Sequence, residues 1–261
     1  MSANFSAKPH VRQRLGKGAG LAVWVMLAFV IGEFLTVGIA QAVNLIYPLA
    51  NVKPIVLNTV LDATAYALAL AVTIALPWWF TKKRSAVTRK DLGVQRLPDW
   101  PDLLLGPVAI VPYLMLSTLF ALVVKVVIPG FDVGQTQSTG FSNLVGQGEL
   151  LLAFVILIIV APIAEEMLFR GYLYGKLRKQ SGLIVSIVLT SVAFAALHLP
   201  GVNESGAFQW QWNVAVDVFA LSIVLCLLRE VTGSIWAGVL LHMAKNSIAF
   251  YILFILPLMV H

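Results

Sequence analysis

The stretch Leu150–Leu177 reads LLLAFVILIIVAPIAEEMLFRGYLYGKL and is apolar except for a short charged centre. It is longer than the roughly 20 residues that an α-helix needs to cross the hydrocarbon core of a bilayer. Glu165, Glu166 and Arg170 lie inside it, where an ionisable side chain is expensive unless it has a partner. The stretch therefore predicts a membrane-spanning helix whose charged centre is a candidate functional site.

The whole chain has the composition of a membrane protein. Of its 261 residues, 59% are hydrophobic and only 11% are charged, whereas soluble domains carry about 25% charged residues. So few charges cannot cover the surface of a water-soluble globule of this size, so we expect lipid to be the solvent. The single cysteine, Cys226, excludes a disulfide within the chain.

Apolar runs recur along the sequence, and they predict an all-α, polytopic helical membrane protein with about seven transmembrane helices. Three runs fall in residues 1–145 and four in residues 146–261, and we expect these ranges to be two membrane regions of one chain. The runs are Leu21–Ala42, Ile55–Phe80, Leu103–Ile128, Leu150–Leu177, Leu183–Leu199, Trp212–Leu228 and Ile235–Met259.

Most of the 18 Lys and Arg residues fall on one side of this seven-span arrangement. Because positive residues stay in the cytoplasm, they predict a multi-pass protein of the cell membrane with a cytoplasmic N-terminus and the C-terminus outside. The charges lie in short loops and form no basic stripe, so the lipid bilayer is an expected partner and nucleic acid is not. The residues on that side are Lys8, Arg12, Arg14, Lys17, Lys82, Lys83, Arg84, Arg89, Lys90, Arg96, Lys176, Arg178, Lys179 and Arg229.

The charged centre of Leu150–Leu177 divides into two faces. Glu166 and Arg170 are four residues apart and can pair on one face. Glu165 lies about 100° further round the helix, so it is free for chemistry or for a partner from another helix. A buried Glu–Arg pair alone is often structural, and this motif alone does not establish a site.

Two later runs carry further polar residues at helical spacing. His242 and Asn246 share a face of the last run, and His198 follows Phe194 by four residues near the end of the fifth. A single His or Asn often only joins helices, but three such motifs together favour a shared site. By helical rise Glu165, His242 and His198 lie about 18, 10 and 23 Å from the cytoplasmic ends of their helices, which permits one cavity.

Other charged residues within the runs look less organised. They are Glu33, Asp62, Lys125 and Asp217. Asp217 lies in the middle of its run, and we expect it to be a partner for Arg170 or Lys245.

The three motifs, Glu165-Glu166-x-x-x-Arg170, Phe194-x-x-x-His198 and His242-x-x-x-Asn246, resemble the signature motifs of the CAAX-protease and bacteriocin-processing (CPBP, or Abi) family. That family includes the type II CAAX prenyl endopeptidases. The motifs occur in order with intact spacing, and the resemblance covers roughly residues 150–261. It implies that residues 146–261 are the catalytic membrane core, with a cavity facing the cytoplasm, and that residues 1–145 are a variable N-terminal region.

The resemblance also implies roles for these residues. Glu165 would be the general base, His198 would hold the attacking water, and His242 and Asn246 would stabilise the oxyanion, in agreement with the chemistry that amide hydrolysis needs. Glu166, Arg170 and Phe194 would be supporting residues. The expected activity is that of an intramembrane endopeptidase that cleaves a membrane-associated peptide or protein.

Alternatives remain open at this point. A zinc ion held by Glu165, His198 and His242 is compatible with the residue types, although the chain lacks an HExxH motif, and a glutamate mechanism without a tightly bound metal is slightly favoured. The same fold could serve as a non-proteolytic scaffold or a bacteriocin-immunity protein. A proton-coupled transporter with a Glu/His relay is a third hypothesis, but the hydropathy pattern contains no inverted repeat.

Overall fold

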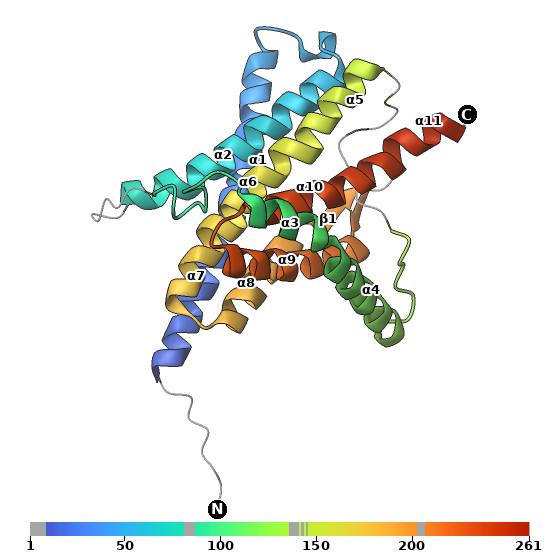
Figure 1. Ribbon diagram of the computed structural model, residues 1–261. Coiled ribbons are helices and arrows are strands. Elements are labelled where there is room, and N and C mark those ends of the chain that lie inside the picture. Colours follow the sequence, from blue (N-terminus) through green and yellow to red (C-terminus); the bar gives the residue numbers. More distant parts are fainter. Residues whose placement is uncertain are drawn as a thin grey trace, which may run out of the picture.

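The computed structural model describes residues 9–80, 87–135, 141, 144, 146–202 and 207–260, and the side chains of residues 9–15, 76–80 and 260 lie outside the description. The predicted cytoplasmic residues Lys8, Lys82, Lys83 and Arg84 are therefore outside the described residues. Helices make up most of the rest (Figure 1). The elements are α1 (Pro9–Asn44), η1 (Leu49–Asn51), α2 (Pro54–Phe80), α3 (Trp100–Val108), α4 (Ile110–Val127), α5 (Gln147–Phe154), η2 (Val155–Val160), α6 (Ala161–Glu166), η3 (Met167–Leu173), α7 (Tyr174–Gln180), α8 (Leu183–Leu197), β1 (Pro200–Val202), β2 (Phe208–Trp210), α9 (Trp212–Thr232), α10 (Trp236–Phe250), η4 (Tyr251–Ile255) and α11 (Leu256–Val260).

Every predicted apolar run is helical, which confirms the all-α, polytopic membrane fold. Within the described residues, five helices are long and apolar enough to cross a membrane, and Leu183–Leu197 is a shorter apolar helix. The total of seven spans stays a prediction. The five helices are Gly16–Asn44, Pro54–Ala75, Trp100–Val127, Gln147–Gln180 and Trp236–Met259.

The predicted run Leu150–Leu177 lies in one continuous helix from Gln147 to Gln180. Two π-helical segments interrupt the α-helical hydrogen bonding of this helix. In the first, the Ala161 N–H donates to the carbonyl of Ile156, five residues back. The next residue is Pro162, which has no N–H, so the carbonyl of Leu157 lacks a donor in this register. The side chain of Asn246 donates to that carbonyl at 2.8 Å. An expected site residue thus also anchors α10 to this helix.

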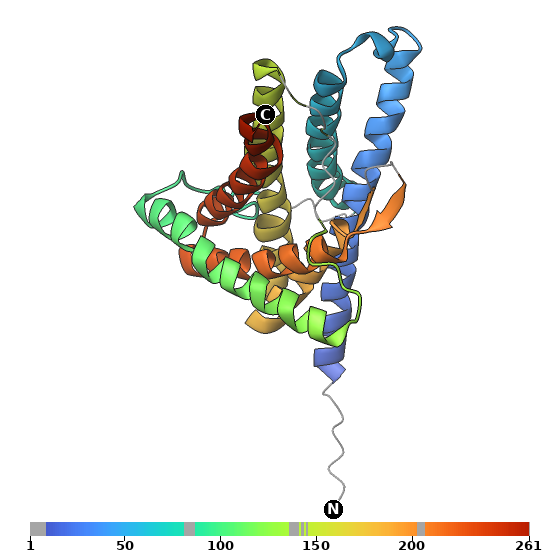
Figure 2. The same cartoon turned by 90° about the vertical axis from the view of Figure 1, so that its right-hand side faces the viewer.

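Helices α1 and α2 form an antiparallel pair beside the α5–α7 helix, and α9 runs across the long helices (Figure 2). The pair meets most closely at Gly32, where an added Cβ would lie 2.8 Å from the Ala69 nitrogen and 3.0 Å from the Ala65 carbonyl oxygen. Such small residues let two helix backbones approach directly. The close contact fixes the position of α2, which borders the polar centre of the α5–α7 helix.

Basic residues near the end of α7 pair with acidic residues of two neighbouring segments. Lys179 forms an ion pair of 3.0 Å with Asp91 from the segment before α3, and Arg178 forms one of 2.9 Å with Glu230 of α9. Hydrogen bonds from Thr88 and the nearby Lys179 ammonium lower the pKa of Asp91 to about 2, so this contact stays charged at neutral pH. The one-sided distribution of positive charge, and the side of the membrane that it faces, stay predictions.

The segment before α3 also packs against the centre of the long helix. A Cβ added to Gly171 would lie 2.2 Å from the carbonyl oxygen of Leu92, closer than any real contact. We therefore expect Gly171→Ala to reduce the free energy of unfolding by about 1–3 kcal/mol, because the backbone must move apart. Thermal unfolding of the purified protein in detergent measures this. Gly175→Ala is the matched control, since its nearest neighbour, the Asp91 oxygen, is 3.9 Å away. Equal loss in both variants would contradict the prediction.

Candidate active site

Glu165 presents its carboxylate to a cavity between α2, α6 and α10. The side chain is 8% exposed. One oxygen, Oε1, accepts a hydrogen bond of 2.8 Å from the Tyr66 hydroxyl of α2. The other, Oε2, has no hydrogen-bond partner among the described residues and lies 3.8 Å from Nε2 of His242. A carboxylate oxygen without a hydrogen-bond donor is able to accept a proton.

Glu166 points away from the cavity, as the helical spacing predicts. Its Oε1 accepts a hydrogen bond of 2.7 Å from Arg170 Nη1, and both side chains are fully buried. Nδ1 of His242 lies 3.2 Å from the same oxygen. An ionised carboxylate accepts hydrogen bonds and cannot donate them, so Nδ1 of His242 carries the proton in this contact. The other ring nitrogen of His242, Nε2, faces Glu165. The Glu166–Arg170 pair thus orients the His242 ring from the side opposite to Glu165.

Phe194 joins the three motifs by packing. Its ring lies 4.4 Å from the Arg170 guanidinium carbon, 4.6 Å from the ring centre of His198 and 6.0 Å from that of His242. Phe194 is fully buried, and the guanidinium above its face makes a cation–π contact. The backbone carbonyl of Phe194 also accepts a hydrogen bond of 2.9 Å from Nδ1 of His198. This bond leaves Nε2 of His198 unprotonated in the neutral ring.

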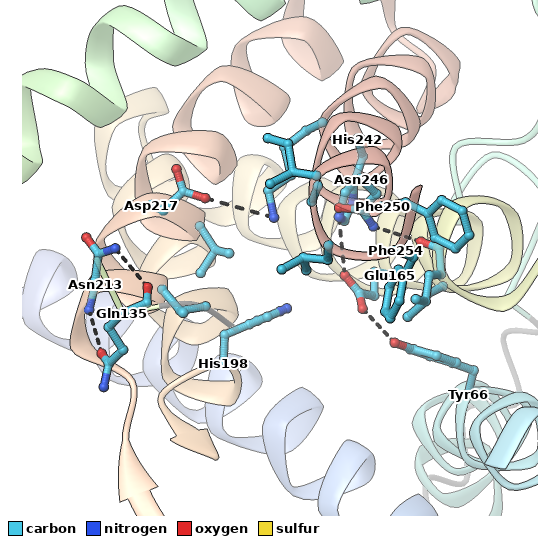
Figure 3. Close-up of a pocket in the computed structure, with 18 residues that line it drawn as sticks. Tyr66, Gln135, Glu165, His198, Asn213, Asp217, His242, Asn246, Phe250 and Phe254 are labelled. Atoms are coloured by element: carbon cyan, nitrogen blue, oxygen red, sulfur yellow. Dashed lines mark hydrogen bonds and ion pairs between the residues drawn. The ribbon is translucent and has the colours of Figure 1, made fainter. Parts of the chain in front are cut away.

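His198 lies at the C-terminal end of α8 and not within the helix. Its side chain nevertheless lines the same cavity as Glu165, His242 and Asn246, although the helical rise places it deepest (Figure 3). The turn after Leu197 and the hairpin of β1 and β2 bring it there. Residues from all three motifs therefore surround one cavity.

The cavity holds about 330 Å³ and is mostly apolar, with polar groups on its walls. Asp217 and Lys245 lie on one wall with 3.9 Å between Oδ2 and Nζ, so Lys245 is the partner of Asp217 and Arg170 is not. Asp217 Oδ1 also accepts hydrogen bonds from Tyr113 and Ser117 at 2.7 and 2.5 Å. The polar lining consists of Tyr66, Gln135, Glu165, His198, Asn213, Asp217, His242, Lys245 and Asn246 (Figure 3).

Sequence reasoning missed Tyr66. The only available signal was its position four residues after Asp62 on one face of an apolar run, and that pattern names no partner. Glu33, Asp62 and Lys125, which were grouped with Asp217 as less organised charged residues of the runs, do not line the cavity. The side chain that completes the environment of Glu165 thus comes from the region that the motifs do not cover.

The predicted zinc ligands do not fit a metal as they stand. In the described part of the chain, no three His, Cys, Asp or Glu side chains are arranged to hold an ion together. Glu165 and His242 approach each other, but Oε1 of Glu165 is already bound by Tyr66. The chemistry below is therefore derived from the side chains themselves.

Residues 147–248 match the family model described as type II CAAX prenyl endopeptidase Rce1-like. A stretch of 63 residues is 38% identical to the UPF0177 protein YxdF of Lactococcus lactis subsp. lactis (strain IL1403), and it covers 24% of this chain and 34% of that protein. The chain thus matches about a third of the length of this relative. No solved structure matches the chain. The family match confirms the resemblance inferred from the motifs, and all seven motif residues lie within it, whereas Tyr66 lies outside.

Proposed function

We propose that this chain, in which residues 147–248 form an Rce1-like domain, is an intramembrane endopeptidase that cleaves a membrane-associated peptide or protein. The observation that carries the proposal is the Glu165 carboxylate, which lines a cavity together with His198, His242 and Asn246 and whose Oε2 has no hydrogen-bond partner among the described residues. The mostly apolar lining of this cavity strengthens the electrostatic effects that hydrolysis requires.

In the proposed reaction, Oε2 of Glu165 removes a proton from a water molecule, and the water oxygen attacks the scissile carbonyl carbon. Nε2 of His198 accepts a hydrogen bond from the second O–H of this water, which stays on the oxygen, because the hydrogen bond to Phe194 leaves that nitrogen without a proton in the neutral ring. The protonated Glu165 then donates its proton to the leaving nitrogen, and the carbon–nitrogen bond breaks. The products are a carboxylic acid and an amine.

The oxyanion formed in this step needs hydrogen-bond donors. The Asn246 amide has two N–H groups, of which one donates to the Leu157 carbonyl, so the other can serve the oxyanion. His242 donates from Nε2 only when it carries a second proton, because Nδ1–H already faces Glu166. We therefore assign the donor role to Asn246, while the oxyanion role expected of His242 stays a prediction.

The first test compares membrane peptides from cells that express the wild type or Glu165→Gln at equal levels. We expect fragment termini that appear only with the wild type, and these name the substrate and the cleavage position. Identical peptides in both samples would contradict the peptidase proposal and favour a scaffold or immunity protein. In that case the partner would co-purify uncut with both forms.

A further inference from the structure

We infer that Tyr66, outside the Rce1-like domain, is a positioning residue for Glu165 and makes α2 part of the active site. The inference rests on the proposed peptidase function and deepens it. Its central observation is the 2.8 Å hydrogen bond from the Tyr66 hydroxyl to Oε1 of Glu165. The two residues are 99 positions apart in the sequence, so the contact depends on how α2 packs beside α6.

The hydrogen bond distinguishes the two oxygens of Glu165. Oε1 is held by Tyr66, while Oε2 has no hydrogen-bond partner in the described part of the chain and faces His242. A carboxylate held at one oxygen cannot rotate freely about its last bond, so the other oxygen stays directed towards His242, which also lines the cavity (Figure 3). Without Tyr66, Glu165 would sample orientations that do not reach the water.

The position of the Tyr66 ring is itself fixed by packing against α1. The Phe29 ring of α1 packs edge-on against the Tyr66 ring, with centroids 5.6 Å apart and an interplanar angle of 81°. Gly32, one turn after Phe29, lets α1 contact α2 at Ala65 and Ala69, on either side of Tyr66. Phe29 and Tyr66 also line a second hollow of about 180 Å³ that borders Glu165 and His198. The α1–α2 pair is therefore a wall of the site.

A structural role for this hydrogen bond would have different consequences. A tyrosine that only joins α2 to α6 would affect folding and leave the chemical step of the folded protein unchanged. A positioning residue affects an interaction made in the transition state, so turnover falls while substrate binding is kept. The two roles separate when turnover and KM are measured on folded protein.

The chain contains a matched control for this test. Tyr113 donates a hydrogen bond of 2.7 Å to Asp217, another carboxylate that lines the cavity. Tyr66→Phe and Tyr113→Phe therefore remove the same hydroxyl from a carboxylate, but only the first carboxylate is the proposed base. The assay uses purified protein in detergent and a synthetic peptide that spans a cut found in the comparison of membrane peptides.

For Tyr66→Phe we expect turnover at saturating peptide to fall about tenfold, with KM changed by less than about twofold. Tyr113→Phe is expected to keep turnover close to that of the wild type. Normal turnover of Tyr66→Phe beside an inactive Glu165→Gln would overturn the inference and leave the peptidase proposal intact. An equal fall in both tyrosine variants, or a change in KM alone, would also overturn it. Full activity of Glu165→Gln would instead refute the glutamate base itself.

Discussion

Glu165→Gln is expected to lower the turnover of a cleaved peptide by about 10²–10⁴-fold, the usual contribution of a general base. Glutamine has almost the same shape, and its carbonyl oxygen can still accept the hydrogen bond from Tyr66. What the variant loses is a basic oxygen at the position of Oε2. The fold and the cavity should therefore remain, and only the proton transfer should fail.

The measurement is turnover of the synthetic peptide by equal amounts of purified folded protein, with thermal unfolding recorded for each variant. Glu33→Gln serves as the control, because it replaces another carboxylate of the membrane helices that does not line the cavity. It should keep wild-type turnover. Turnover of Glu165→Gln within a few-fold of the wild type, at unchanged stability, would remove Glu165 from the role of base.

The helices and the motif contacts could be predicted because both depend on local spacing. Hydrophobic runs of sufficient length indicated the helices, and four-residue spacing indicated the pair of Glu166 with Arg170. Helix geometry also placed the adjacent Glu165 and Glu166 on different faces, where their side chains contact different neighbours. These features follow from the geometry of a single helix and need no knowledge of its surroundings.

Contacts between helices could not be predicted in the same way. Tyr66 meets Glu165, and Asp217 meets Lys245, because of where the helices cross, and apolar runs do not encode crossing positions. The depth estimate for His198 assumed a straight continuous helix, whereas α8 ends at Leu197 and the chain turns there. The hydrogen bond from Asn246 to Leu157 depends on the carbonyl left free by Pro162.

The comparison of Arg170 with Arg178 tests how the site is supported. Each arginine pairs with a glutamate, but the Arg170–Glu166 pair is fully buried, whereas the side chains of Arg178 and Glu230 are 40% and 33% exposed. Removing one partner of a buried pair leaves an uncompensated charge, so Arg170→Met is expected to reduce the free energy of unfolding by about 3–5 kcal/mol. Arg178→Met should reduce it much less, because solvent screens the exposed pair.

Unfolding in detergent measures both variants, and the double variant Glu166→Gln with Arg170→Met identifies the cause. Because this double variant removes both charges, it should recover part of the stability lost in Arg170→Met alone. Its activity should still fall, since a neutral amide cannot offer His242 the charged acceptor that the Glu166 carboxylate does. Equal losses of unfolding free energy in Arg170→Met and Arg178→Met would mean that burial of the Arg170–Glu166 pair adds no stability. Support of the site would then depend on the packing of Phe194 against its neighbours.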